Sequence, residues 1–391
     1  MATQDAYWLA LRRVRGIGPR IARLLLEKFE SPEKIFAADE RELVAAGLPR
    51  PVARRIREFN DFEALERELC ELPRIGARLI RWSDADYPVN LREIADPPPA
   101  LFVQGELVAG EKKFVAVVGA RAASEAGRRM ARRLGLELAA KGFIVVSGLA
   151  RGIDSEAHQG ALDAGGRTIA VLGCGIDVVY PAENRSLAEA IVSGGGALIS
   201  ELPVGTPPIA ENFPSRNRIL SGLSLGVVVV EAAERSGSLI TARTALEQNR
   251  QVFAVPGSPM SGRSRGSNRL LKDGARLVEC VEDVIEELAP QLVGLEPSTH
   301  QSDSVGNKPR NNLVFPKRDP AQTARVATLS IDDESKDVKK LLNCFKNVEK
   351  LHVDSIIELS GLKAQTVLTL LMDLELRGLI TQHPGKLFSL S

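Results

Sequence analysis

The sequence predicts an α/β fold, a doubly wound parallel sheet, in the central part of this 391-residue chain. Between residues 78 and 290, short runs of apolar, largely β-branched residues alternate with helical stretches. The runs are apolar almost throughout, which is typical of parallel strands that are buried on both faces. A helix after each strand then covers the sheet, so the predicted domain is Rossmann-like.

The predicted elements of this domain follow one another in regular alternation. Six strands are predicted, at 114–118, 143–147, 168–172, 197–200, 227–231 and 251–255. The helices between them are predicted at 125–141, 153–165, 184–194, 216–223 and 238–249. Ligands of open α/β sheets bind beyond the carboxyl ends of the strands. The loops that follow the strands are therefore where we expect the functional residues.

Smaller domains are predicted on either side of residues 78–290. Residues 1–77 contain two Gly/Pro turns that each lead into a basic amphipathic helix, which predicts an all-helical domain. The turn at Gly16 fits a domain of the helix-hairpin-helix (SAM-like) type, and the alternative is a helical domain that packs against protein. Residues 291–335 are polar, lack periodicity and are predicted to be a flexible linker. Residues 336–391 combine helices with a final hairpin, which is the pattern of a winged helix.

The composition excludes several classes of protein. No apolar run reaches the roughly 18–20 residues of a membrane span, and the first residues lack the pattern of a secretory signal. The four cysteines are far apart and form no Cys-x-x-Cys pair, so neither a zinc site nor a disulfide framework is indicated. We therefore expect a cytoplasmic protein that has no contact with a membrane. Because the net charge is only +1, a nucleic-acid site would need a local cluster of positive charge.

Arginines follow the ends of most predicted strands. Because the carboxyl ends of parallel strands meet at one edge of a sheet, these arginines are expected to face the same rim. They are Arg121, Arg151, Arg216, Arg218, Arg263 and Arg265. A rim of this kind would bind the phosphates of a nucleic acid.

Small residues beside these arginines are candidates for binding phosphate through backbone N–H groups. Gly119 and Arg121 follow the first strand, and the start of the next helix offers free N–H groups to an anion. The loops after the second and fifth strands contribute Ser147, Gly148, Arg151, Gly152, Asp154, Ser236, Gly237, Ser238 and Thr241. The structural alternative is a set of tight turns, in which Asp154 and Ser236 only cap helices.

The segment after the fourth strand contains an aromatic residue outside any apolar period. Phe213 stands in a proline-bounded loop, and Arg216, Asn217 and Arg218 follow it. A base of a single strand stacks on such a ring while the arginines hold its phosphates. The alternative is a phenylalanine that fills the core, with surface arginines beside it.

The sequence offers no convincing catalytic group. His158 lies on a predicted helix and is more simply a structural histidine, and Cys174 is more simply a small residue in a tight turn. There is no Gly-x-x-x-x-Gly-Lys-Ser/Thr loop and no carboxylate pair in an acid–base setting. We therefore expect a protein that is not an enzyme and requires neither a metal nor a cofactor.

The loops carry an ordered set of short motifs. They include Val118-Gly-Ala-Arg121, Ser147-Gly-Leu-Ala-Arg-Gly-Ile-Asp154, Tyr180-Pro181, Phe213-Pro-Ser-Arg-Asn-Arg218, Ser236-Gly-Ser-Leu-Ile-Thr241 and Val255-Pro-Gly257. Together these motifs resemble the bacterial DNA-processing protein family, DprA/Smf. The resemblance is dense over about residues 80–285, and the two outer domains also resemble appendages of that family.

The resemblance implies that the central domain binds single-stranded DNA. It further implies homodimerisation, protection of incoming DNA and loading of RecA recombinase during natural transformation. Carried over by motif, Arg121 and residues 213–218 become the leading DNA contacts, and residues 147–154 and 236–241 are weaker candidates for the pocket.

Two other functions remain open at this point. A nucleotide-processing enzyme of the phosphoribohydrolase kind would use a related fold, but it carries a Pro-Gly-Gly-x-Gly-Thr run where this chain has residues 236–241. A winged-helix transcription factor would bind duplex DNA tightly through residues 336–391 alone.

Overall fold

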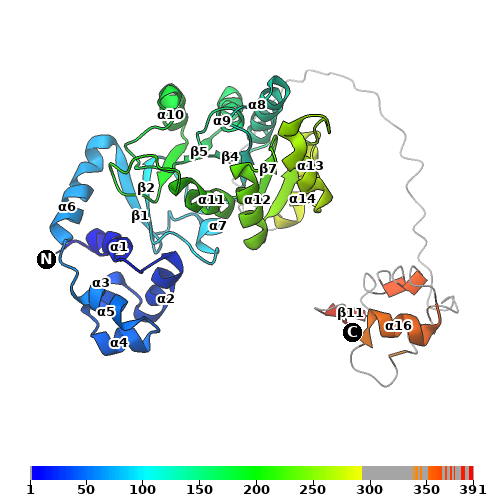
Figure 1. The fold of residues 1–391 in the computed structure, drawn as a ribbon, viewed down its shortest axis with the longest axis horizontal. Helices are drawn as coiled ribbons and strands as arrows, with labels where there is room; N and C mark the ends of the chain where they lie inside the picture. The colour runs from blue at the N-terminus through cyan, green and yellow to red at the C-terminus, as the bar shows by residue number, and fades with distance from the viewer. Residues whose placement is uncertain are drawn as a thin grey trace, which may run out of the picture. The chain divides into compact units, whose positions relative to one another are not determined.

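The computed structural model describes residues 2–292 and parts of 338–390, which form two compact units (Figure 1). The first unit contains a nine-stranded sheet in the order β1-β2-β6-β5-β4-β3-β7-β8-β9, and the second contains a three-stranded sheet. None of the helices in these described residues is both long enough and apolar enough to span a membrane.

The parallel part of the large sheet confirms the predicted fold. All six predicted strands are present, as β3 (Phe114–Val118), β4 (Ile144–Ser147), β5 (Thr168–Val171), β6 (Ala197–Ser200), β7 (Gly226–Val229) and β8 (Gln251–Ala254). Pairing is parallel from β6 through β5, β4, β3, β7 and β8 to a short β9 (Arg276–Leu277). After β3, the chain adds β4, β5 and β6 on one side of it and then β7, β8 and β9 on the other side. The strand order therefore reverses between β3 and β7. A crevice for a ligand is expected at this switch point.

Three strands of this sheet were not predicted: the short β9 and two strands that make the sheet mixed. β1 (Ala77–Arg81) pairs antiparallel with β2 (Ala100–Gly105), and β2 pairs antiparallel with β6. The first half of β2 is as apolar as the parallel strands. However, it directly follows three prolines, and prolines argue against a strand, so its start was not predicted. In β1, Ala77 and Ile80 are buried while Arg78 is exposed, so the strand carries only a short amphipathic pattern.

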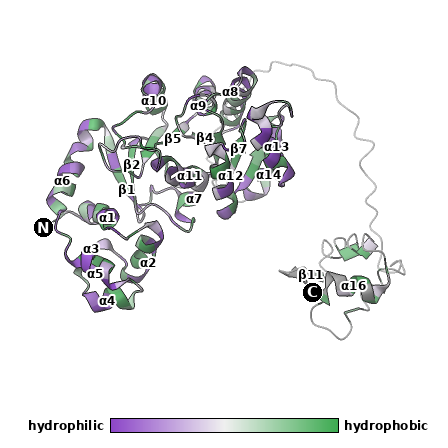
Figure 2. Ribbon diagram, viewed as in Figure 1, coloured by the Kyte–Doolittle hydropathy of each residue, from purple (hydrophilic) through white to green (hydrophobic). Residues whose placement is uncertain are grey.

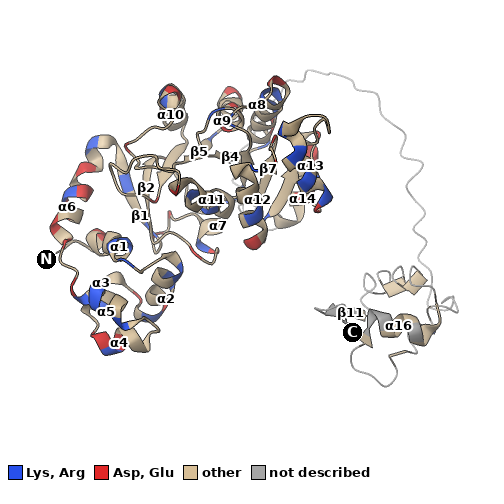
Figure 3. Ribbon diagram, in the orientation of Figure 1, with Lys and Arg blue, Asp and Glu red and all other residues tan. Residues whose placement is uncertain are grey.

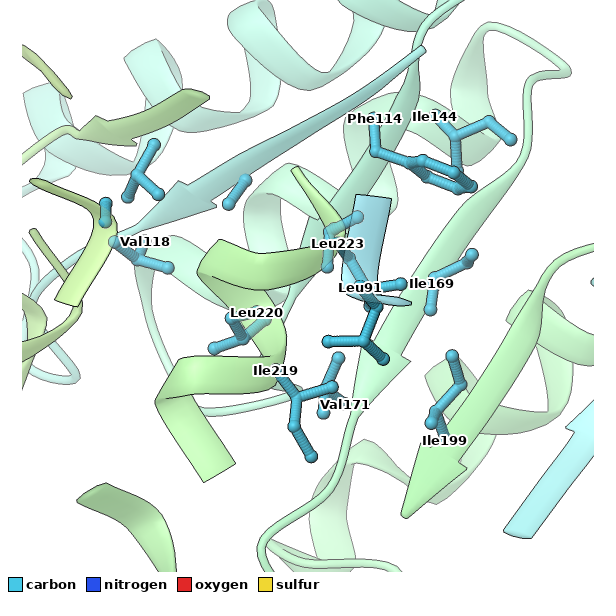
Figure 4. Close-up of a cluster of buried hydrophobic side chains, with 14 of the residues drawn as sticks. Leu91, Phe114, Val118, Ile144, Ile169, Val171, Ile199, Ile219, Leu220 and Leu223 are labelled. Carbon is cyan, nitrogen blue, oxygen red and sulfur yellow. The ribbon is translucent and has the colours of Figure 1, made fainter. Parts of the chain in front are cut away.

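Helices cover both faces of the sheet. α7 (Val89–Arg92), α11 (Asn212–Leu223) and α12 (Gly237–Glu247) enclose one apolar core against it. Figure 4 shows Ile219, Leu220 and Leu223 of α11 among the apolar side chains of this core. α8 (Glu125–Ala140), α9 (Ile153–Asp163) and α14 (Val281–Leu292) enclose a second core on the opposite face. α10 (Arg185–Ser193) and α13 (Arg265–Lys272) complete the layers, and Figure 2 shows hydrophilic residues on the outward side of α13.

The N-terminal region is helical, as predicted. It contains α1 (Gln4–Arg13), α2 (Pro19–Phe29), α3 (Pro32–Ala37), α4 (Glu40–Ala45), α5 (Arg50–Arg57) and α6 (Phe62–Glu71). Its two predicted turns are alike, because Gly16 and Gly47 have φ angles of 102° and 100°. Besides their own core, these helices share one with the sheet, in which Leu9 and Leu65 join Phe102. The helical region is therefore fixed to the antiparallel edge of the sheet.

The C-terminal unit is a winged helix. It contains β10 (Leu351–His352), α16 (Val353–Ser360) and the predicted hairpin, formed by β11 (Ile380–His383) and β12 (Leu387–Leu390). β12 lies between β10 and β11, and Ile356, Leu371 and Phe388 belong to the unit's core. The helix predicted at 364–377 and the linker predicted at 291–335 lie for the most part outside the described residues.

Candidate nucleic-acid interface

A pocket of about 260 Å³ lies at the carboxyl edge of the sheet, where the strand order reverses. Of the fifteen residues predicted for the site, ten line it: Gly119, Arg121, Asp154, Phe213, Arg216, Asn217, Ser236, Gly237, Ser238 and Thr241. The structure thus brings together the loops after β3 and β4 with the starts of α11 and α12. The other five predicted residues, Ser147, Gly148, Arg151, Gly152 and Arg218, do not line the pocket.

Phe213 and Arg121 form the mouth of this pocket. Phe213 is half-buried in the first turn of α11, and a Cβ added to Gly173 would approach its ring to 2.8 Å. The guanidinium carbon of Arg121 lies 5.2 Å from the ring centroid, and that of Arg216 lies 5.9 Å away. These are cation–π distances. Arg121 is exposed, and no acidic partner is found for it in the described chain, so it offers a free charge to a ligand.

Arg216 is a buried cation at the base of the pocket, with 6% of its surface exposed. Its Nη1 donates to the carbonyl oxygens of Val171 and Gly148, at 3.0 Å for the latter. Its Nε donates to Asn217 Oδ1 at 3.2 Å. Burial lowers the pKa of Arg216 to about 10, so the group stays charged at neutral pH. Arg216 therefore contributes a fixed positive charge and organises the loops around it.

Asp154 and Gly148 lie close to the guanidinium of Arg216 and shape its surroundings. The N–H of Gly148 donates to Asp154 Oδ2 at 3.1 Å, and burial raises the pKa of Asp154. A Cβ added to Gly148 would lie 2.5 Å from Arg216 Nη2. The role of Gly148 is thus to let its backbone approach the guanidinium closely.

Arg218 lies away from the pocket, which corrects the expectation that it holds a DNA backbone beside Arg216. Its Nη2 donates to Glu201 Oε2 at 2.5 Å, and its Nη1 donates to the carbonyl of Asp96 at 2.7 Å. Helix α11 starts at Asn212 instead of residue 216. Residues two apart on a helix point in different directions, whereas Phe213, Arg216 and Asn217 share one face.

The rest of the loop after β4 supports the pocket without facing it. The Ser147 hydroxyl donates to the Val117 carbonyl at 2.6 Å, and both groups are buried. Gly152 has a φ of 76°, and a Cβ there would lie 2.4 Å from the Ala120 carbonyl. Arg151 is exposed, but its Nη2 donates to Glu183 Oε2 at 2.7 Å. The charge expected from Arg151 is therefore largely neutralised.

A carboxylate of the protein itself lies at the start of α8, where a phosphate site was expected. The carboxylate of Glu231 accepts hydrogen bonds there, from Ser124 N at 3.2 Å and Ser124 Oγ at 2.5 Å. Glu231 is 5% exposed and lies close to Gly127, where an added Cβ would come 2.5 Å from Oε2. The protein's own carboxylate thus occupies the position that an anion would take.

The start of α12 is the helix N-terminus that opens into the pocket. Ser236 caps it by accepting from Ser238 N at 3.4 Å, and the two hydroxyl oxygens lie 2.7 Å apart. Gly237 and Thr241 share a helix face, and both line the pocket. Thr241 is 2% exposed, and none of the described residues hydrogen-bonds to its hydroxyl. Backbone N–H groups and hydroxyls at this place are suited to a phosphate.

Sequence reasoning missed the apolar part of the lining. Pro214, Leu220 and Ile240 also face the pocket. Leu220 is seven residues after Phe213, and Ile240 is three after Gly237, so each follows from helical spacing once the starts of α11 and α12 are known.

His158 and Cys174 are structural residues. The hydroxyl of Thr168 donates to the Val145 carbonyl, so it accepts from Nδ1 of His158 at 2.7 Å. Burial lowers the pKa of His158 to about 3, which keeps the ring neutral. Burial also raises the pKa of Cys174 to about 11, and its thiol donates to the Val178 carbonyl. No group of His, Cys, Asp and Glu suited to a metal ion is found in the described part of the chain.

Arg263 and Arg265 are exposed, and neither lines the pocket. Arg265 begins α13, and the next residue, Gly266, donates its N–H to the Ala232 carbonyl at 2.7 Å. This contact holds the start of α13 against the loop that precedes α12. Figure 3 shows basic residues on α13. Of the six arginines expected at one rim, the residues described here leave Arg121, Arg263 and Arg265 exposed without an acidic partner.

The chain matches three family models along its length. The model described as DNA recombination-mediator protein A matches residues 78–289. The DprA winged helix domain matches residues 325–386, and the SAM-like helix-hairpin-helix tandem matches residues 9–59.

Similar proteins include one curated relative that spans almost the whole chain. Protein Smf of Synechocystis sp. is 36% identical over 98% of this chain and 98% of that protein. The X-ray structure of DNA processing protein A from Streptococcus pneumoniae covers 73% of this chain and 99% of its own, with a TM-score of 0.63 and 36% identity. A Helicobacter pylori DNA processing protein A, whose structure is described for its single-stranded DNA binding mode, covers 55% and 96%, with a TM-score of 0.50 and 28% identity.

Proposed function

Because the chain belongs to the DNA recombination-mediator protein A family, we propose that it binds single-stranded DNA across the carboxyl edge of its sheet. In this proposal it protects DNA that enters the cell during natural transformation. It then passes the strand to RecA recombinase for recombination. The protein acts in the cytoplasm by binding alone, without chemistry on the strand.

The observation that carries the proposal is the Arg121–Phe213 pair at the mouth of the pocket. Arg121 is exposed, stacks over the ring at 5.2 Å and has no acidic partner in the described chain. Beside it lie the start of α12, with Ser238 and Thr241, and the buried charge of Arg216. Three separate groups that favour an anion thus surround the pocket. The Helicobacter pylori relative supports the choice of a single strand as the ligand.

A second copy of the chain and RecA are the protein partners in this proposal. The parallel end of the sheet is the two-residue strand β9, whose Leu277 is 47% exposed. An exposed apolar side chain at the rim of a sheet is suited to burial against another chain. We therefore place the homodimer contact there. Sedimentation of the full chain and of Leu277→Lys tests it, because the variant is expected to shift the protein toward monomer.

A nucleotide-processing enzyme is the alternative, and Asp154 is the observation that favours it. Asp154 is the carboxylate that lines the pocket in the described residues, and an enzyme of this kind needs one as an acid or base. However, this carboxylate accepts from Gly148 N and lies near the Arg216 charge, which gives it a structural role. Release of ribose from nucleoside monophosphates by the full chain would establish the enzyme and displace our proposal.

The central test compares single-stranded with double-stranded DNA in a mobility-shift assay on the full chain. We expect tighter binding of the single strand, and about tenfold or greater loss for Arg121→Gln, because a charge-assisted phosphate contact contributes about 1.5–3 kcal/mol. Arg133→Gln is the matched control, since Arg133 is also an exposed arginine but is paired with Glu137 on α8, outside the pocket. Equal losses in both variants, or a preference for duplex, would contradict the proposal.

A further inference from the structure

Tyr180 is the only exposed aromatic side chain among the residues that the structure describes, with 40% of its surface accessible. It follows β5 at the same carboxyl edge of the sheet that carries the pocket. Its ring centroid lies 5.9 Å from that of Phe213, and the two rings are tilted by 50°. An exposed ring next to a binding pocket is available to stack on a base of a bound single strand.

The ring of Phe213 is already engaged by the protein. Gly173 lies against it so closely that an added Cβ would approach Cδ1 to 2.8 Å. Arg121 lies over the ring at 5.2 Å, Arg216 is at 5.9 Å and Tyr180 is its aromatic neighbour. A base that stacked on Phe213 would have to displace Arg121 or share the space with it. The aromatic surface that remains open to a ligand belongs to Tyr180.

The pocket is small, so a bound single strand must also contact the protein outside it. A pocket of about 260 Å³ is too small for the several nucleotides per domain that are bound by proteins that track a single strand. The strand must therefore leave the pocket over its rim. On the side of β5, the residues beside Tyr180 are the exposed ion pair of Arg151 and Glu183. An exposed ring beside a neutralised ion pair is suited to stacking a base.

We propose that Tyr180 is an aromatic platform, which stacks the base of the nucleotide next to the one bound at Arg121. This inference rests on the proposed binding of single-stranded DNA. In this arrangement Phe213 is the inner support, which orients both Arg121 and Tyr180. Tyr180 is the outer surface, which contacts the strand.

The first experiment uses the unaltered full chain. Single-stranded DNA that contains 5-iododeoxyuridine is bound and irradiated, and the cross-linked peptide is identified by mass spectrometry. The halogenated base reacts most readily with an aromatic ring stacked on it, so we expect the cross-link on Tyr180. Cross-links confined to other residues would overturn the proposal.

The second experiment compares Tyr180→Ala with Tyr180→Phe. Loss of one stacked base is expected to weaken single-strand binding about tenfold in Tyr180→Ala, while Tyr180→Phe keeps the ring and stays within about twofold of the unaltered chain. Equal weakening in both variants would show that the hydroxyl is the contact, and no weakening in either would show that the ring is not used. Either result would contradict the proposal that the ring of Tyr180 stacks a base.

The outcomes separate this inference from the function on which it rests. If the unaltered chain does not bind single strands, the proposed function fails. If it binds them and Arg121→Gln weakens binding, but the cross-link and Tyr180→Ala give negative results, only the platform fails. Thermal unfolding of both Tyr180 variants verifies that the fold is retained, and the cross-link remains decisive if Tyr180→Ala is unstable.

Discussion

Two helices begin at the same edge of the sheet, and their N-termini have opposite roles. The start of α8 is occupied by the carboxylate of Glu231, which accepts from the backbone and hydroxyl of Ser124. The start of α12 is capped by Ser236 alone and opens into the pocket beside Thr241. Both helices follow parallel strands, and both present backbone N–H groups at their first turn. A ligand site therefore depends on whether the protein supplies its own anion.

The difference between the two helix N-termini also predicts which residues affect the stability of the fold and which affect DNA binding. At α8, a buried carboxylate satisfies the helix end and ties the loop after β7 to the start of α8, so its loss should affect folding. At α12, the same type of end is left for a ligand, so changes there should affect affinity and leave folding largely intact. We therefore expect the largest change in stability at the start of α8 and smaller changes, in affinity, around the pocket.

The largest effect is expected at Glu231. Glu231→Ala removes a buried acceptor of hydrogen bonds from Ser124 N and Oγ, and such loss leaves donors unsatisfied. We expect the free energy of unfolding to fall by about 3 kcal/mol, as measured by urea denaturation. Glu125→Ala is the control, because Glu125 lies in the same turn but is exposed. If the two variants have the same stability, the carboxylate does not hold the start of α8.

A smaller effect, on affinity, is expected at Phe213. Phe213→Ala removes the ring on which Arg121 lies and which contacts Tyr180. We expect single-strand binding to weaken by about 2 kcal/mol, because Arg121 loses the support that orients its charge-assisted contact with a phosphate, as measured by fluorescence anisotropy. Phe213→Leu fills part of the space under Arg121 but offers no π face, so it should bind almost as weakly as Phe213→Ala. Normal affinity in either variant would contradict the central role of the ring.

The fold was largely predictable from the sequence, and the site was predictable only as a set of loops. Apolar runs predicted six strands because burial on both faces leaves a strong signal, whereas β1 is short and amphipathic. Arg216 and Arg218 could not be separated without the start of α11, since a shift of a few residues changes which side chains share a face. Glu231 was not predicted as the partner of Ser124, because the contact joins residues 107 positions apart in the chain. Such pairing is fixed by the strand order, which local patterns do not contain.

The effect at Thr241 should be smaller than that at Phe213. Thr241→Val keeps the shape of the side chain and removes only a hydroxyl that lines the pocket. We expect single-strand affinity to fall by about 1 kcal/mol, which is typical of one hydrogen bond, with little change in the unfolding midpoint. Thr244→Val is the matched control, because Thr244 lies one turn along α12 and its hydroxyl donates to the Ile240 carbonyl, outside the pocket. An unchanged affinity in Thr241→Val would mean that α12 does not present the phosphate site.

The smallest effect is expected at the exposed arginines beside α13, and salt dependence is the way to detect it. Each phosphate that a cation neutralises adds about 0.7 to the slope of log affinity against log salt for a single strand. Arg263→Gln combined with Arg265→Gln should lower that slope by about 1.4 if both side chains contact the strand. Arg269→Gln is the control on the same helix, since Arg269 is already paired with Asp273 at 3.6 Å. A slope that is unchanged in the double variant would confine the positive site to the pocket and to Arg121. A lowered slope would extend it from the open end of α12 to α13, along the side of the sheet away from Tyr180.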